Sequence, residues 1–152
     1  MHRKCFVLAA SLVLGLCAGA GATIFSGSDE ESELGQIMEK VQKNKATITK
    51  GVRNVASYTK SREDVEKAAK EWAKLAKDTR PHNEVVKSAK GQADPQKKWD
   101  ELIDQWVKDS EKLAEITGQA DSSQKDAKDQ LNTINKTCTE CHQVFRIDSD
   151  DF

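Results

Sequence analysis

Proline, glycine and aromatic residues are scarce in this chain. Its 152 residues include 2 prolines, 8 glycines and only 5% aromatic residues, and no segment alternates apolar and polar positions as a strand would. These scarcities argue against a β-rich fold, whose many turns need glycine and proline. Charge is abundant instead, at 32% of residues, alongside many alanines. This composition is typical of a water-soluble, all-α domain.

An excess of one charge sign is also lacking. The chain has 24 Lys and Arg residues against 25 Asp and Glu residues, and the two signs are interleaved along its length. A nucleic-acid-binding protein concentrates basic residues on one face. The charge pattern therefore indicates no nucleic-acid partner.

The N-terminus has the pattern of a secretory signal peptide, which we assign to residues 1–22. A basic start over residues 2–4 is followed by an apolar core over 6–16 and by small residues over 18–22. Export places the mature protein in the periplasm, an oxidising space.

Two other interpretations of this segment stay open. The apolar run can be read through to Phe25, about 20 residues, as a retained anchor, and only then would the chain associate with a membrane. A lipoprotein signal at Cys17 is disfavoured because the large Leu16 precedes it. Cleavage would leave Cys138 and Cys141 as the only cysteines of the mature chain.

Four stretches of the mature chain have helical periodicity. A lead-in over 23–33, with a capping box at 28–31, opens the first, and an acidic tail over 148–152 follows the last. The segment 81–93 is predicted to be the longest connection, with one helical turn near Val85. The first predicted helix runs from about residue 29 to 56–59, and the second from a capping signal at 61–64 to 80. The third runs from Asp94-Pro95 to Gly118, and the fourth from Asp121 or Ser122 to 147.

Short connections between amphipathic helices predict an antiparallel, up-down-up-down four-helix bundle over residues 34–147. In this topology the first and last helices are neighbours, and the start of one lies beside the end of the other. Met38 and His142 then lie at depths that differ by only about 6 Å, at 1.5 Å per residue. A planar cofactor fits between two such side chains.

The segment Cys138-Thr139-Glu140-Cys141-His142 is the most informative part of the chain. C-x-x-C-H is the attachment signature of a c-type haem. The two thiols lie on neighbouring helical turns and can form thioether bonds to the haem vinyl groups. The histidine that follows supplies an imidazole to the iron. The signature predicts one covalent haem c, attached through Cys138 and Cys141 with His142 as the proximal ligand.

Other interpretations of the same residues are weaker. A zinc site needs four ligands, usually in two spaced pairs, and the mature chain offers only His82 beyond this motif. A thioredoxin-like motif needs a βαβ context, and a disulfide across two residues of a helix is strained. A haem-free helical binding protein is the remaining alternative.

With this motif at the extreme C-terminus, followed by Val144-Phe145-Arg146, the sequence resembles the class II cytochromes c, the cytochrome c prime family. The resemblance covers roughly residues 34–147. Aligning 36–40 with the first helix of the family places Met38 on the open side of the haem. The family usually has an arginine four residues earlier, near the haem propionates, where this chain has Leu34.

The resemblance implies a single-electron carrier whose iron is bound by His142 and Met38, the low-spin branch of the family. The alternative is a five-coordinate protein that binds nitric oxide or carbon monoxide, with Met38 not bound to iron. Lys40 or Arg146 could replace the missing arginine at the propionates. We expect Phe145 to border the haem.

We expect the three tryptophans to be core residues, one of them against the porphyrin edge, and His82 to be an exposed loop residue. No acid–base pair or nucleophile is evident, so the chain is not predicted to be an enzyme. Its expected partners are redox proteins of unknown identity, and a homodimer is possible.

Overall fold

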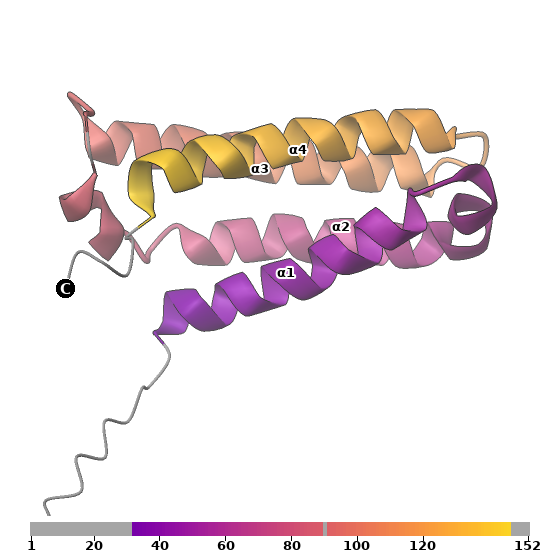
Figure 1. Ribbon diagram of the computed structural model, residues 1–152, viewed down its shortest axis with the longest axis horizontal. Coiled ribbons are helices and arrows are strands. Elements are labelled where there is room, and N and C mark those ends of the chain that lie inside the picture. The colour runs from indigo at the N-terminus through magenta and orange to yellow at the C-terminus, as the bar shows by residue number, and fades with distance from the viewer. Residues whose placement is uncertain (1–31, 90, 147–152) are drawn as a thin grey trace, which may run out of the picture. The chain divides into compact units, whose positions relative to one another are not determined.

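The computed structural model describes residues 32–89 and 91–146, within one compact unit of the chain. The predicted signal peptide, most of the lead-in with its capping box at 28–31, and the acidic tail lie outside the described residues. None of the described helices has both the length and the apolar character that a membrane span requires. The elements are α1 (Glu33–Gly51), α2 (Val55–Thr79), the 3-10 helix η1 (Glu84–Ser88), α3 (Pro95–Gly118) and α4 (Gln124–Phe145) (Figure 1).

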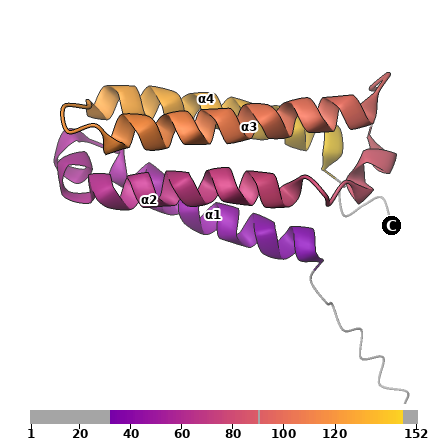
Figure 2. The same cartoon turned by 180° about the vertical axis from the view of Figure 1, so that it is seen from behind.

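The four helices form the predicted antiparallel, up-down-up-down bundle, and no strand occurs in the described segments. The α1–α2 and α3–α4 turns lie at one end, and the α2–η1–α3 connection lies at the other (Figure 2). That second end also holds the start of α1 and the end of α4. The predicted helical turn near Val85 is confirmed as η1.

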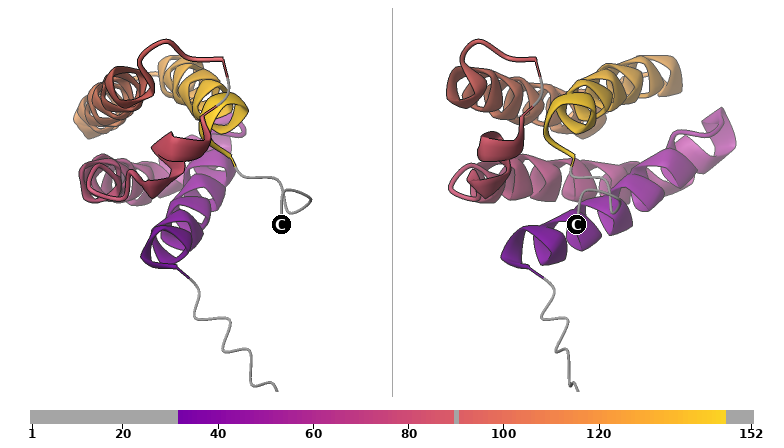
Figure 3. Two further views of the ribbon diagram at one scale, coloured as in Figure 1. Left: turned by 90° about the vertical axis from the view of Figure 1, so that its left-hand side faces the viewer. Right: turned by 60° about the vertical axis from the view of Figure 1, so that its left-hand side comes forward.

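The packing of the four helices is uneven. Helix α2 packs closely against both α1 and α3, and α4 packs mainly on α3, whereas α1 and α4 contact each other little. Figure 3 shows the first turns of α1 diverging from the last turns of α4. The bundle is therefore open between its first and last helices, at the end where Met38 and His142 lie.

Side-chain caps fix where each helix begins. Ser32, Asn54, Asp94 and Ser123 each accept a hydrogen bond from the backbone N–H three residues later. Such caps satisfy N–H groups that have no partner within the helix. The predicted start at Asp94, with Pro95 in the first turn, and the predicted end at Gly118 are both confirmed.

Some predicted boundaries differ from the structure. Helix α1 ends at Gly51 rather than at 56–59, because the Asn54 side chain caps a new helix there. The capping signal at Ser61 is confirmed in part: two helical segments meet at a kink there, where Ser61 has non-helical angles of −120° and 17°, but the first of them already begins at Val55. Helix α4 begins after Ser123, since the hydroxyl of Ser122 is instead hydrogen-bonded to that of Tyr58 at 2.7 Å.

The close approach of α1 to α2 depends on the buried Gly51. A Cβ atom at this position would lie 2.3 Å from Cγ2 of Val65, which is itself fully buried. Gly51→Ala should therefore lower the free energy of unfolding by about 1–3 kcal/mol through overpacking. Gly118→Ala is the matched control, because its Cβ would meet only the flexible end of Glu66 at 3.4 Å. Chemical denaturation of both variants measures their free energies of unfolding. Equal free energies for Gly51→Ala and Gly118→Ala would contradict the overpacking at Gly51.

Candidate functional site

A cavity of about 590 Å³ lies at the open end of the bundle. All four helices and η1 contribute to its wall. From α1 come Leu34, Met38, Val41, Gln42 and Lys45; from α2 and η1 come Trp72, Thr79 and Val85. From α3 come Trp99, Leu102, Ile103 and Trp106; from the end of α4 come Asn135, Thr137, Cys138, Thr139, Cys141, His142, Phe145 and the following Arg146.

The structure brings together the six residues that the sequence nominated for haem attachment, iron ligation and the border of the haem, but not Lys40. Cys138, Cys141 and His142 line the cavity from α4, and Met38 lines it from α1. Phe145 and Arg146 complete the same wall. The helical period explains this, because positions 138, 141, 142 and 145 share one face of α4. Their roles toward a haem stay predictions.

The two cysteines are free thiols, half-buried in the cavity wall. Burial raises the pKa of Cys138, and a smaller effect of Lys45 opposes this. Burial, with a contribution from Cys138, raises the pKa of Cys141 from 9.0 to about 11, against an opposing effect of Lys98. Both groups are therefore protonated thiols at neutral pH in the haem-free chain.

This shift predicts slow alkylation of Cys141. Two pKa units correspond to about a hundredfold less thiolate, the reactive form, at pH 8. In the folded haem-free chain, iodoacetamide should therefore modify Cys141 about a hundredfold more slowly than in the same chain unfolded in urea, with a rate that rises with pH. Peptide mapping by mass spectrometry measures both rates. Equal rates in the folded and unfolded chain would refute the burial of this thiol.

The imidazole of His142 is biased toward its neutral form. Burial is the largest cause that lowers its pKa below 6.5, followed by the positive charges of Arg146 and Lys45. Neutral imidazole is the form that binds a metal. In the haem-free chain, His142 therefore takes up a proton more readily when unfolded than when folded. Protonation of this residue favours the unfolded state, so the folded chain should lose stability as the pH falls below about 6.5. His142 is also exposed to solvent, which screens the effect.

The three tryptophans are buried, as predicted, and all line the cavity. The indole N–H of Trp72 donates to the carbonyl of Val41 at 3.0 Å, and that of Trp99 donates to the carbonyl of Arg80 at 3.1 Å. Trp106 differs, because its Nε1 is buried and has no hydrogen-bond partner among the described residues.

A second buried polar atom in the cavity wall, Oδ1 of Asn135, also has no partner within the described part of the chain. Buried polar atoms without partners are uncommon in proteins. The indole of Trp106 can donate, and the amide of Asn135 can accept, a hydrogen bond from a group held in the cavity or from a water molecule beside it. This part of the wall thus fits a bound group better than tight protein packing.

Lys45 was missed by the sequence interpretation. Lys40, nominated in place of the missing arginine, is exposed and lies outside the cavity wall, whereas Lys45 lines it. Lys45 follows Met38 by seven residues, two helical turns, and that spacing could have revealed it. Leu34, where the family usually has arginine, also lines the cavity. Lys45 and Arg146 therefore supply the positive charge of this wall.

His82 is not part of the cavity wall. It lies in the connection after α2, as predicted, but it is half-buried rather than exposed, with its Nδ1 3.9 Å from Oε2 of Glu33. This neighbour at the start of α1 accounts for the difference.

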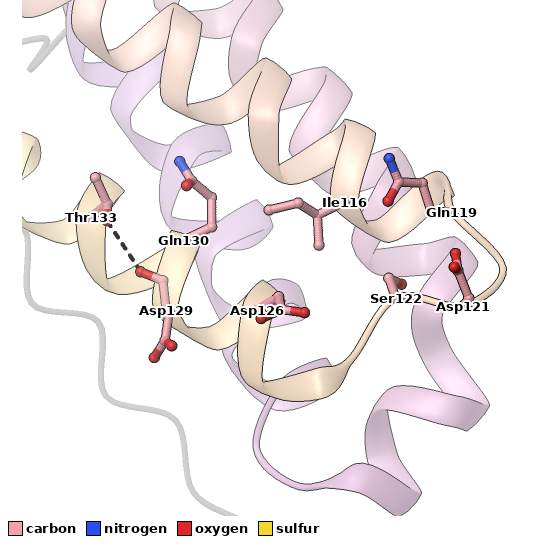
Figure 4. A pocket seen from close by; sticks show the side chains of 8 residues that line it. All are labelled: Ile116, Gln119, Asp121, Ser122, Asp126, Asp129, Gln130 and Thr133. Carbon is pink, nitrogen blue, oxygen red and sulfur yellow. Dashed lines mark hydrogen bonds between the residues drawn. The ribbon is translucent and has the colours of Figure 1, made fainter.

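A second hollow, of about 530 Å³, lies at the opposite end of the bundle (Figure 4). It is lined by the α3–α4 turn and by the first turns of α4, with Asp121, Asp126 and Asp129 among the lining residues. Figure 4 shows these carboxylates spread along the chain rather than converging on one point. Within the described residues, no group of three acidic, histidine or cysteine side chains could hold a metal ion.

Comparison with known proteins gives one match. The family model described as Cytochrome C' matches residues 32–146, which is most of the chain. Neither a curated protein nor a solved structure matches.

Proposed function

The chain belongs to the cytochrome c prime family, and we propose that it is a haem c protein that carries single electrons in the periplasm. Membership of this family implies haem c and a role in electron transfer or gas binding. One observation carries the finer proposal: the thioether of Met38 and the imidazole of His142 line one cavity from opposite helices, with both thiols beside the histidine.

The residues of the cavity fit a haem. Its volume of about 590 Å³ lies within the range of cofactor pockets, and tryptophan, leucine and isoleucine side chains form much of its wall. We propose that Cys138 and Cys141 form the two thioether bonds, with one haem held per chain. Lys45 and Arg146 are the cations available to balance the propionates.

We propose His142 as the proximal iron ligand and Met38 as the sixth ligand. A His and Met ligand pair raises the reduction potential of a cytochrome c. When bound, the haem supplies a one-electron iron couple. The protein has to hold two ligands and exclude water, which requires no general acid, general base or nucleophile, so we propose a carrier rather than an enzyme.

Two contacts hold these ligands in place. The indole of Trp72 on α2 binds the carbonyl of Val41, one helical turn after Met38, and so fixes this part of α1. On α4, the ring of Phe145, three residues after His142, packs edge-on against Trp99 with centroids 5.2 Å apart. Rigid ligands keep the structural change on electron transfer small.

Gas binding is the second candidate, and the sparse contact between α1 and α4 favours it. Met38 is only partly buried and lies on the helix that contacts α4 sparsely. If its sulfur is not bound to iron, or is easily displaced, the open side can accept nitric oxide or carbon monoxide.

Location and partners follow from the proposed role. Proteins of this family are typically exported, and residues 1–22 carry the signal pattern. We propose redox proteins as partners, with a homodimer possible. Membrane association would require retention of the N-terminal segment.

An optical spectrum of the purified holoprotein in both oxidation states tests the proposal. A low-spin spectrum in both states, with the weak long-wavelength ferric band of methionine–iron ligation and little carbon monoxide binding, would support the electron carrier. A high-spin spectrum with ready carbon monoxide binding would support the gas-binding protein. Absence of a haem spectrum after production in a host that matures c-type cytochromes would refute both.

A further inference from the structure

Asp109 is a carboxylate in the core of the bundle. It lies in the middle of α3 and is only 7% exposed. It is the one charged side chain among the buried residues of the described segments, and no lysine, arginine or histidine there forms an ion pair with it. Burying a charge without a cation is costly, so stability alone does not explain this residue.

Polar hydrogen bonds replace the missing cation. The amide Nε2 of Gln105, on the same helix, donates to Oδ2 of Asp109 at 2.8 Å. Gln130 on α4 donates through Nε2 to the backbone carbonyl of Asp109 at 3.0 Å and to Oδ1 at 3.4 Å. The hydroxyl of Thr137 on α4 is 3.5 Å from Oδ2. Gln130 and Thr137 are two turns apart on one face of α4, so Asp109 contacts that face of the helix at two points.

This network leads directly to the cavity. Thr137 lines the cavity and immediately precedes Cys138. Asp109 lies opposite the middle of the α4 segment from Gln130 to Thr137. The middle of this segment precedes His142 by about 8 to 9 residues, a separation of about 13 Å along the helix. Because Asp109 is buried, salt screens its charge less than that of a surface carboxylate.

We propose that Asp109 is a positioning residue with an electrostatic role: it holds α4 so that the C-x-x-C-H motif faces the cavity, and its buried negative charge lowers the reduction potential of the bound haem. This inference rests on the proposed function. On oxidation the iron centre loses one electron and gains one positive charge, which a nearby negative charge stabilises. For a charge about 13 Å from the position of His142 on α4 and an effective dielectric constant of about 20, the Coulomb energy favours the ferric form roughly tenfold.

Asp109→Asn tests the charge at nearly constant shape. The asparagine keeps an oxygen that accepts hydrogen bonds but removes the negative charge. The reduction potential of the holoprotein should rise by about 59 mV, which for one electron equals a roughly tenfold change in the redox equilibrium constant. The optical spectrum should stay unchanged. Glu111→Gln is the matched control, because Glu111 lies two residues further along α3 but is exposed and paired with Lys77 at 2.7 Å. The reduction potential of the Glu111→Gln variant should shift by less than the equivalent of a twofold change in the redox equilibrium. This small shift should disappear at high salt.

The experiment distinguishes a failure of this inference from a failure of the proposed function. A haem-loaded, reversibly reducible Asp109→Asn variant with the wild-type potential would overturn the inference and leave the function intact. A wild-type protein without a reversible one-electron couple would refute the function itself. If Asp109→Asn does not fold or load haem, Gln130→Lys places a cation beside the intact carboxylate and should also raise the potential. An unchanged potential in Gln130→Lys would then overturn the inference.

Discussion

Replacing both Cys138 and Cys141 with alanine is expected to abolish covalent haem attachment completely. The thiols are the only cavity-lining groups that can form thioether bonds, since Met38 already has both sulfur valences in use. Alanine favours the helix and removes only half-buried sulfur atoms, so the four-helix bundle should still form. Intact mass under denaturing conditions should show the bare chain, and any haem should be removed by acidic acetone. Each single variant should keep one thioether bond.

The residues between the cysteines provide the control. Glu140 lies between the two thiols in sequence but is exposed, and it is paired with Lys98 at 3.8 Å. Glu140→Gln should keep the full complement of attached haem. Haem that stays bound to the double alanine variant after denaturation would show that Cys138 and Cys141 are not the attachment sites.

Met38→Ala is expected to change the coordination and spin state of the iron. If Met38 supplies the sixth ligand, its removal leaves His142 as the only protein ligand and opens the α1 side of the cavity. The ferric spectrum should change from low spin to high spin, carbon monoxide should bind readily to the reduced form, and the reduction potential should fall. Optical spectra with and without carbon monoxide, together with a redox titration, measure all three effects.

Ile37→Ala is the matched control for this change. Ile37 is the neighbouring residue on α1 and packs partly against the core, but it does not line the cavity. Its replacement should lower stability modestly and leave the spectrum unchanged. A Met38→Ala variant with the wild-type spectrum would show that Met38 is not a ligand; an unchanged high-spin spectrum would in addition favour the gas-binding candidate.

Much of the site was predictable because it depends on local periodicity and simple topology. Cys138, Cys141 and His142 share a helical face whatever the rest of the chain does. Met38 and His142 line one cavity because short connections bring the start of α1 and the end of α4 to the same end of the bundle. The Asp94-Pro95 start could be read from sequence for the same reason, since a cap acts within one helical turn.

Features that depend on contacts between distant segments could not be predicted. The end of α1 at Gly51 combines a local cap at Asn54 with a close approach to Val65 on α2. The start of α4 depends on Tyr58, 64 residues earlier, which bonds the hydroxyl of Ser122. Asp109 is a different case: it lies three residues after Trp106 and four before Leu113 on the apolar face of α3, so helical periodicity already places it toward the core.

The mass of the intact, denatured wild-type protein tests the central claim most directly: that the cavity between α1 and α4 holds a haem bound covalently to the last helix. The protein should be purified from a host that exports and matures c-type cytochromes. The claim predicts the mass of the chain plus one haem, with neither Cys138 nor Cys141 left to alkylate. A mass equal to that of the polypeptide alone, with two alkylatable thiols, would contradict it.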